Sequence, residues 1–82
     1  MKIYERLKDS FLDKEYFIST TNNYIYILNY NNIELFKDDK IIIKFKKFNL
    51  LLLGRKFIIT RKNKNELEIK GTLSKMEIIN EI

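Results

Sequence analysis

The hydrophobic positions change their spacing near residue 15. Before it, Ile3, Leu7 and Phe11 recur every four residues, and charged or polar side chains fill most of the positions between them. Residues four apart lie on one face of a helix, so this spacing predicts an amphipathic helix. We therefore predict an N-terminal helix at 1–14 and a β-domain at 15–82.

The predicted helix has too few residues to be stable alone. A helix of about 12 residues is marginal in water, so its apolar stripe must dock onto another surface. That surface is the chain's own sheet or a sister subunit, a separate protein partner, or a lipid membrane; acidic residues among the basic ones weigh against lipid. The candidate partner-docking stripe consists of Ile3, Tyr4, Leu7 and Phe11.

From residue 15 onward the apolar positions alternate with a period of two, which is typical of β-strands. Asparagine pairs and the run Lys37-Asp38-Asp39-Lys40 mark turns between short apolar segments. Turn signals about every 8 to 10 residues predict an all-β fold, a small antiparallel meander of six to seven short strands, rolled or sandwiched.

Irregularities are predicted at three places in the second half of the chain. Gly54 permits a tight turn or bulge after a run of leucines, and Gly71 interrupts the last apolar segment. A bulge near Ser74 would return Met76 and Ile78 to the core face.

The central strands carry two apolar faces. The core face is expected to hold Ile41, Ile43, Leu50, Leu52, Phe57 and Ile59. The residues of the opposite phase are apolar too. Tyr24, Tyr26 and Tyr30 are likewise predicted to share one side of a strand. A helix of about 12 residues spans about 18 Å, too little to cover such a second surface, so we predict self-association. The predicted interface comprises Tyr24, Tyr26, Ile42, Leu51, Leu53 and Ile58.

The composition fits one small globular domain. The chain has 82 residues, of which 45% are hydrophobic and 33% charged, too apolar for disorder. The longest unbroken aliphatic run, Leu50 to Leu53, is far short of the roughly 20 residues that a spanning helix needs. With no signal-peptide pattern, we expect a cytoplasmic protein, at most peripheral to a membrane.

The residue types exclude several kinds of chemistry. The chain has no cysteine and no histidine, which removes disulfides, thiolate nucleophiles, the usual structural zinc sites and the commonest general base at neutral pH. Glu34, Asp38 and Asp39 lack the alternating acid spacing and central glycine of a calcium loop. We expect no enzymatic activity, no cofactor, no metal and no small-molecule substrate.

A net charge of +5 raises the alternative of a small basic β-module that binds nucleic acid or an anionic surface. Phe45, Phe48 and Phe57 lie close to basic residues and could stack on bases. These rings also share the apolar phase of their strands, which favours core positions and argues against nucleic acid as a partner. The basic residues have another explanation, because charged side chains at the edge of a sheet prevent aggregation with other strands. The predicted basic patch comprises Lys44, Lys46, Lys47, Arg55, Lys56 and Arg61.

Four segments of the β-region carry an ordered pattern of apolar positions, glycines and one Asn-Tyr pair: Tyr24 to Ile33, Leu35 to Ile43, Leu50 to Ile59 and Glu66 to Ile78. In this order and spacing they resemble the YabP/YqfC family of bacterial sporulation proteins. The resemblance extends over about three quarters of the chain.

This resemblance implies a function that the spacing alone does not reveal. It implies a non-enzymatic structural protein of endospore formation, made in the mother cell, that works beside a membrane-protein partner. Together with the predicted second apolar face, it leads us to expect a homo-oligomer located at a membrane surface.

Overall fold

The computed structural model describes residues 16–81, which form one six-stranded antiparallel sheet. No helix occurs in this part of the chain, so none there could span a membrane. The all-β class is confirmed, whereas the predicted helix at 1–14 lies outside the described residues. The strands are β1 (Phe17–Thr20), β2 (Tyr24–Leu28), β3 (Asn32–Phe36), β4 (Lys40–Lys44), β5 (Asn49–Lys62) and β6 (Glu66–Ile79).

The strand order is β1-β2-β6-β5-β4-β3, which corrects the predicted simple meander. Strands β3 to β6 do follow one another across the sheet, and β1 pairs with β2. However, β2 pairs with Glu66–Lys70, the first part of β6, and not with β3. A strand has two edges, and β6 uses one for β2 and the other for β5. Because β6 has 14 residues, it extends beyond its pairing with β2.

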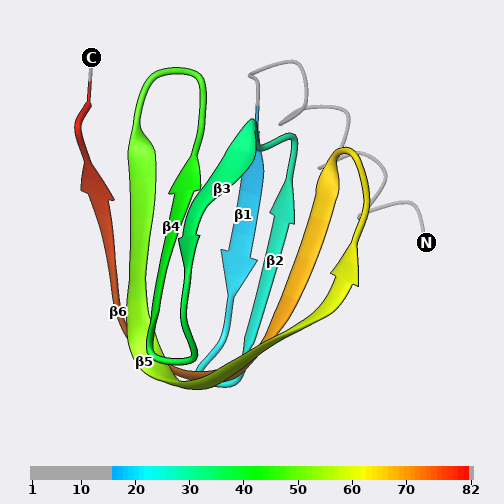
Figure 1. The fold of residues 1–82 in the computed structure, drawn as a ribbon, viewed down its shortest axis with the longest axis vertical. Helices are drawn as coiled ribbons and strands as arrows, with labels where there is room; N and C mark the ends of the chain where they lie inside the picture. The colour runs from blue at the N-terminus through cyan, green and yellow to red at the C-terminus, as the bar shows by residue number, and fades with distance from the viewer. Residues whose placement is uncertain (1–15, 82) are drawn as a thin grey trace.

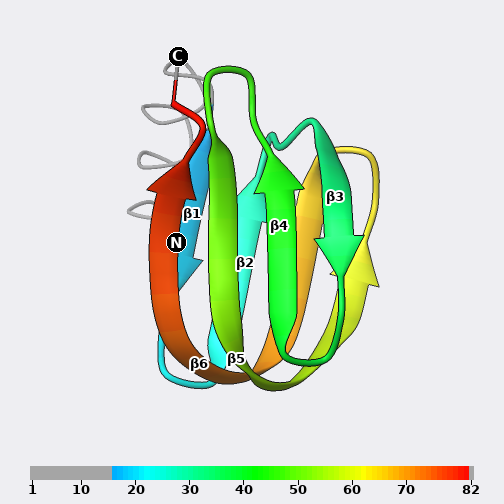
Figure 2. The same cartoon turned by 60° about the vertical axis from the view of Figure 1, so that its left-hand side comes forward.

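The long strands β5 and β6 bend near their middle, so that the sheet folds over onto itself (Figures 1 and 2). One half, the first limb, contains β1, β2, the first half of β6 and the second half of β5. The second limb contains β3, β4, the first half of β5 and the second half of β6. Gly54 and Gly71 therefore do not end strands, as the division into short strands predicted; they lie where two continuous strands bend.

The bend is built around the Phe57 ring, which is buried between two glycines. A Cβ atom on Gly54 would lie 1.9 Å from the carbonyl oxygen of Thr72, and one on Gly71 would lie 2.7 Å from the Phe57 ring. The pairing of β5 and β6 shifts register on both sides of this point, and such bulges increase the bending of a strand.

Backbone hydrogen bonds attach the β3–β4 turn to the bend. The amide of Gly54 donates to the carbonyl oxygen of Asp39 over 3.0 Å, and that of Phe57 donates to Asp38 over 2.9 Å. The predicted turn at Lys37 to Lys40 is confirmed, since the amide of Lys37 donates to the carbonyl of Lys40. These acidic residues therefore lie in a turn that supports the bend.

The core lies between the two limbs. Its largest fully buried side chains come equally from both: Ile25, Ile27, Leu67 and Ile69 from the first, and Ile41, Ile43, Leu50 and Leu52 from the second. The predicted core set is confirmed, although Ile59 is only partly buried.

The prediction that Tyr30 shares a face with Tyr24 and Tyr26 is wrong, because Tyr30 is buried. Asn29 adopts a φ of 65°, in the left-handed region, so the alternation of β2 stops before Tyr30. The Tyr30 hydroxyl donates to the carbonyl oxygen of Asn63 over 3.2 Å.

Candidate interaction surfaces

The outer face of the second limb carries an apolar row that crosses three strands. Leu35 of β3 pairs with Ile42 of β4, which pairs with Leu51 of β5. Leu53 points to the same face two residues further along β5, and all four side chains are half-buried. We call these residues the outer apolar patch: Leu35, Ile42, Leu51 and Leu53.

Leu35 was missed by sequence reasoning. Ile33 and Leu35 are two residues apart, so a regular strand would place both on one face. The pairing of β3 with β4 shifts register between them, which leaves Ile33 opposite core residue Ile43 and Leu35 opposite Ile42. Polar Glu34 between two apolar residues looks like ordinary alternation, so the sequence contained no signal for this bulge.

The outer face of the first limb has a different chemistry. The hydroxyl groups of Tyr24 and Tyr26 donate hydrogen bonds to the carboxylates of Glu68 and Glu66, over 2.5 and 2.6 Å. The ring of Phe17 packs edge-on against that of Tyr26, with centroids 6.4 Å apart. The tyrosines thus belong to a polar and aromatic surface whose hydroxyl groups already have partners.

The six residues of the predicted interface therefore do not form one surface. Ile42, Leu51 and Leu53 lie on the outer face of the second limb. Tyr24, Tyr26 and Ile58 lie on the first limb, where Ile58 is 62% exposed and pairs with Lys70, which in turn pairs with Tyr24. Because the sheet folds over, these outer faces point away from each other (Figures 1 and 2).

The stability that the Tyr24–Glu68 pair contributes is expected to depend on pH. The hydrogen bond to Glu68, the burial of the hydroxyl and the charge of the Glu68 carboxylate raise the pKa of Tyr24 to about 12. Because this exceeds the ordinary value of about 10, the stabilisation is complete below pH 10 and is lost as the pH rises toward 12. An ultraviolet titration of phenolate formation should show a late phase, and Glu68→Gln should move it to lower pH. A late phase that persists unchanged in Tyr24→Phe would contradict this assignment.

The residues of the predicted basic patch are dispersed over the surface. Lys44, Lys46 and Lys47 lie at and beyond the end of β4, whereas Arg55 and Lys56 lie at the bend. Figure 1 shows that the β4–β5 turn and the bend are at opposite ends of the molecule. Arg61 lies on the first limb, 3.9 Å from a carboxylate oxygen of Glu66.

The three phenylalanines near these basic residues are not available for base stacking. Phe45, Phe48 and Phe57 are all buried, as their phase predicted. Phe45 and Phe48 stack on each other with ring centroids 4.8 Å apart. The ring of Tyr16 packs edge-on against both of them.

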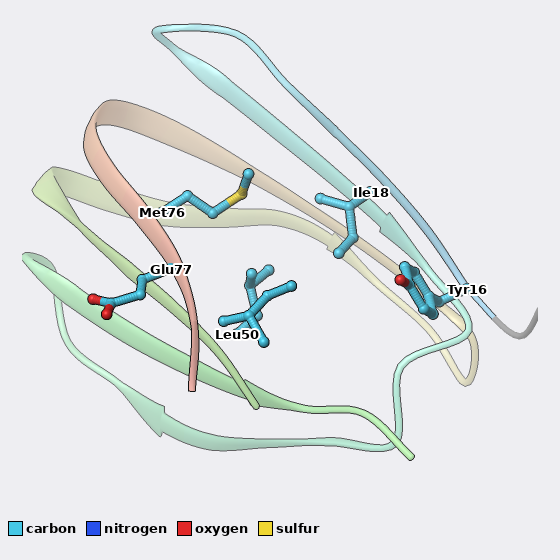
Figure 3. Close-up of a pocket in the computed structure, with 6 residues that line it drawn as sticks. Tyr16, Ile18, Leu50, Met76 and Glu77 are labelled. Carbon is cyan, nitrogen blue, oxygen red and sulfur yellow. The ribbon is translucent and has the colours of Figure 1, made fainter. Parts of the chain in front are cut away.

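An apolar groove of about 540 Å³ opens between the N-terminal end of β1 and the second half of β6 (Figure 3). Met76 and Ile78 point into it, and they are 45% and 49% exposed. The predicted bulge is present, because Ser74 is skipped in the pairing of β6 with β5. It places Met76 opposite Leu52 and Ile78 opposite Leu50, on the inner face, but they are not buried as core residues. The groove is lined by Tyr16, Ile18, Leu50, Met76, Glu77 and Ile78.

Neither a candidate metal site nor a buried polar residue occurs in residues 16–81. Within residues 16–81 no three histidine, cysteine, aspartate or glutamate side chains gather into a possible metal site. No polar or charged residue there is buried.

Comparisons with protein families, with characterised proteins and with solved structures found no match to this chain. The resemblance to the YabP/YqfC family therefore stays a prediction.

Proposed function

We propose that this chain is a non-enzymatic structural protein of the YabP/YqfC type that acts in endospore formation by self-association and by docking to a membrane-protein partner. It works in the cytoplasm of the mother cell, at the surface of a membrane. The observation that supports self-association is the outer apolar patch on the second limb.

The patch has the features of the centre of a protein interface. Its side chains are aligned across neighbouring strands, and Ile42 and Leu51 lie directly opposite each other. Lys40 and Lys75 flank Leu53 on the adjoining strands, and Glu77 follows Leu51 in the same row. An apolar centre with a charged rim is the usual composition of an interface core and its surroundings. In a symmetric dimer one such patch serves both subunits.

Replacing Leu51 and Leu53 together by lysine tests this proposal. Two charges at the centre of an apolar contact would have to lose water on association, so the oligomer is expected to dissociate. Light scattering across a dilution series should show a smaller particle. Far-ultraviolet circular dichroism should show that the sheet persists, since both side chains are only half-buried.

The matched control adds two lysines elsewhere. Ser19→Lys with Asn65→Lys places the same charge at exposed positions of the first limb and should leave the particle size unchanged. Deletion of the gene from its source organism is expected to block sporulation, and the Leu51 and Leu53 double variant should fail to restore it. Wild-type sporulation with that variant would contradict the role of the patch.

The alternative, a basic module for nucleic acid or an anionic surface, has less support in the fold. The six basic residues are dispersed over two ends and one outer face, and the nearby rings are buried. Nonetheless, titration with an oligonucleotide at two salt concentrations provides a direct comparison. A monomer at every dilution that binds with a steep salt dependence would favour this alternative over self-association.

Docking to a membrane-protein partner follows from the family resemblance alone. Among residues 16–81, no surface is favoured for that contact.

A further inference from the structure

The groove beside β1 is an incomplete part of the core. Leu50 and Leu52 are buried on the inner face, but their cross-strand neighbours Ile78 and Met76 are about half exposed. Ile18 and Tyr16 lie on the other side of the groove (Figure 3). Large apolar side chains that point inward and still contact water indicate that an apolar cover belongs there.

The lining favours a hydrophobic chain segment over a small polar ligand. Small-molecule sites combine apolar walls with several convergent polar groups. Here the only lining side chains with polar atoms are Tyr16 and Glu77. Figure 3 shows the carboxylate of Glu77 directed away from Tyr16 and Ile18, so it does not converge on the groove.

The chain itself leads a suitable segment to this place. Residues 1–15 join the described structure at Tyr16, which lines the groove. In a helix over 1–14 with a rise of 1.5 Å per residue, Phe11 and Leu7 would lie about 5 Å and about 11 Å along the axis from its last residue. That residue is two positions before Tyr16. A segment attached this closely has a high effective concentration at the groove, which a separate molecule lacks.

We propose that the apolar stripe of residues 1–14, comprising Ile3, Tyr4, Leu7 and Phe11, packs into this groove of its own chain and covers Met76 and Ile78. Of the three surfaces open to the stripe, this assigns it to the chain's own sheet. The inference does not depend on self-association through the outer apolar patch, which lies on the opposite face of the second limb.

Thiol labelling of the full-length chain tests whether the groove is covered. The sequence has no cysteine, so Met76→Cys introduces a single reporter. A maleimide should label it slowly, and adding Leu7→Asp should accelerate labelling by about tenfold, because one large apolar side chain shifts an open–closed equilibrium by that order. Arg6→Asp, on the charged side of the stripe, is the control and should leave the rate unchanged. Equal rates in all three variants would overturn the proposal.

Disulfide trapping tests which chain supplies the cover, and it does not require the Leu7 variant to fold. In Phe11→Cys with Ile78→Cys, mild oxidation should give an intrachain disulfide that runs as a monomer on a non-reducing gel. Phe11→Cys with the outward Ile58→Cys is the control and should remain reduced. A disulfide-linked dimer would assign the groove to the segment of a second copy and overturn the proposal, as would the absence of any crosslink.

Discussion

Replacing Phe57 by alanine is expected to lower the free energy of unfolding by about 3 to 5 kcal/mol, the usual cost of removing a buried aromatic ring. The effect is expected to be large because the ring fills the inside of the bend, where the glycines of β5 and β6 leave room for it. A small domain has only about 5 to 15 kcal/mol of stability, so this loss removes a large fraction of it. Urea denaturation followed by circular dichroism would measure the change.

The neighbouring residue supplies the control for this substitution. Ile58 is adjacent in sequence but 62% exposed, so Ile58→Ala should change the stability by only about 0.5 kcal/mol. Similar losses in the two variants would show that the Phe57 ring does not support the bend.

Gly54→Ala is expected to destabilise the protein by about 3 kcal/mol or more, the upper range for overpacking a core. The added methyl group would lie 1.9 Å from the carbonyl oxygen of Thr72, which is backbone in the paired strand β6. Unlike a flexible side chain, this oxygen cannot move without breaking the pairing of β5 with β6. Thermal unfolding should show a large decrease in Tm.

Two further variants serve as comparisons for the effect of Gly54→Ala on stability. Gly71→Ala combines a φ of 149° with a contact of 2.7 Å to the Phe57 ring, so it should also destabilise the fold. Ser74→Ala lies at the exposed bulge of the same strand pair and should be nearly neutral. Equal stability of Gly54→Ala and Ser74→Ala would show that the backbone of β6 does not approach Gly54 this closely.

Much of the local structure could be predicted from the sequence, because alternation reports which face of a strand is buried. The phases of Ile41, Ile43, Leu50 and Leu52 are sufficient to identify the core. Topology could not be predicted in the same way. Nothing local indicates that β2 pairs with β6, since a β-strand has two edges and alternation concerns only its faces. Glycine likewise signals an irregularity at residue 54, but it does not tell a turn from a bend in a continuous strand.

The candidate interface was only partly predictable for the same reason. The phase of Leu51 and Ile42 correctly indicated an outward face with apolar residues. In the folded-over sheet, however, outward positions on the two limbs face opposite directions. Tyr24 and Leu51 therefore lie on different surfaces. Two devices also hid the phase of single residues: the bulge beside Leu35 and the left-handed conformation of Asn29 before Tyr30.

The position of β6 between β2 and β5 also determines when the sheet can be completed during protein synthesis. Tyr26 and its partner Glu66 are 40 residues apart, so the ribosome needs roughly 2 to 8 s to make the chain between them at 5 to 20 residues per second. Until then the β1–β2 hairpin has no neighbour, and an isolated hairpin is marginally stable at best. The nascent chain therefore exposes apolar strands for seconds, and chaperones that hold such segments should improve its yield.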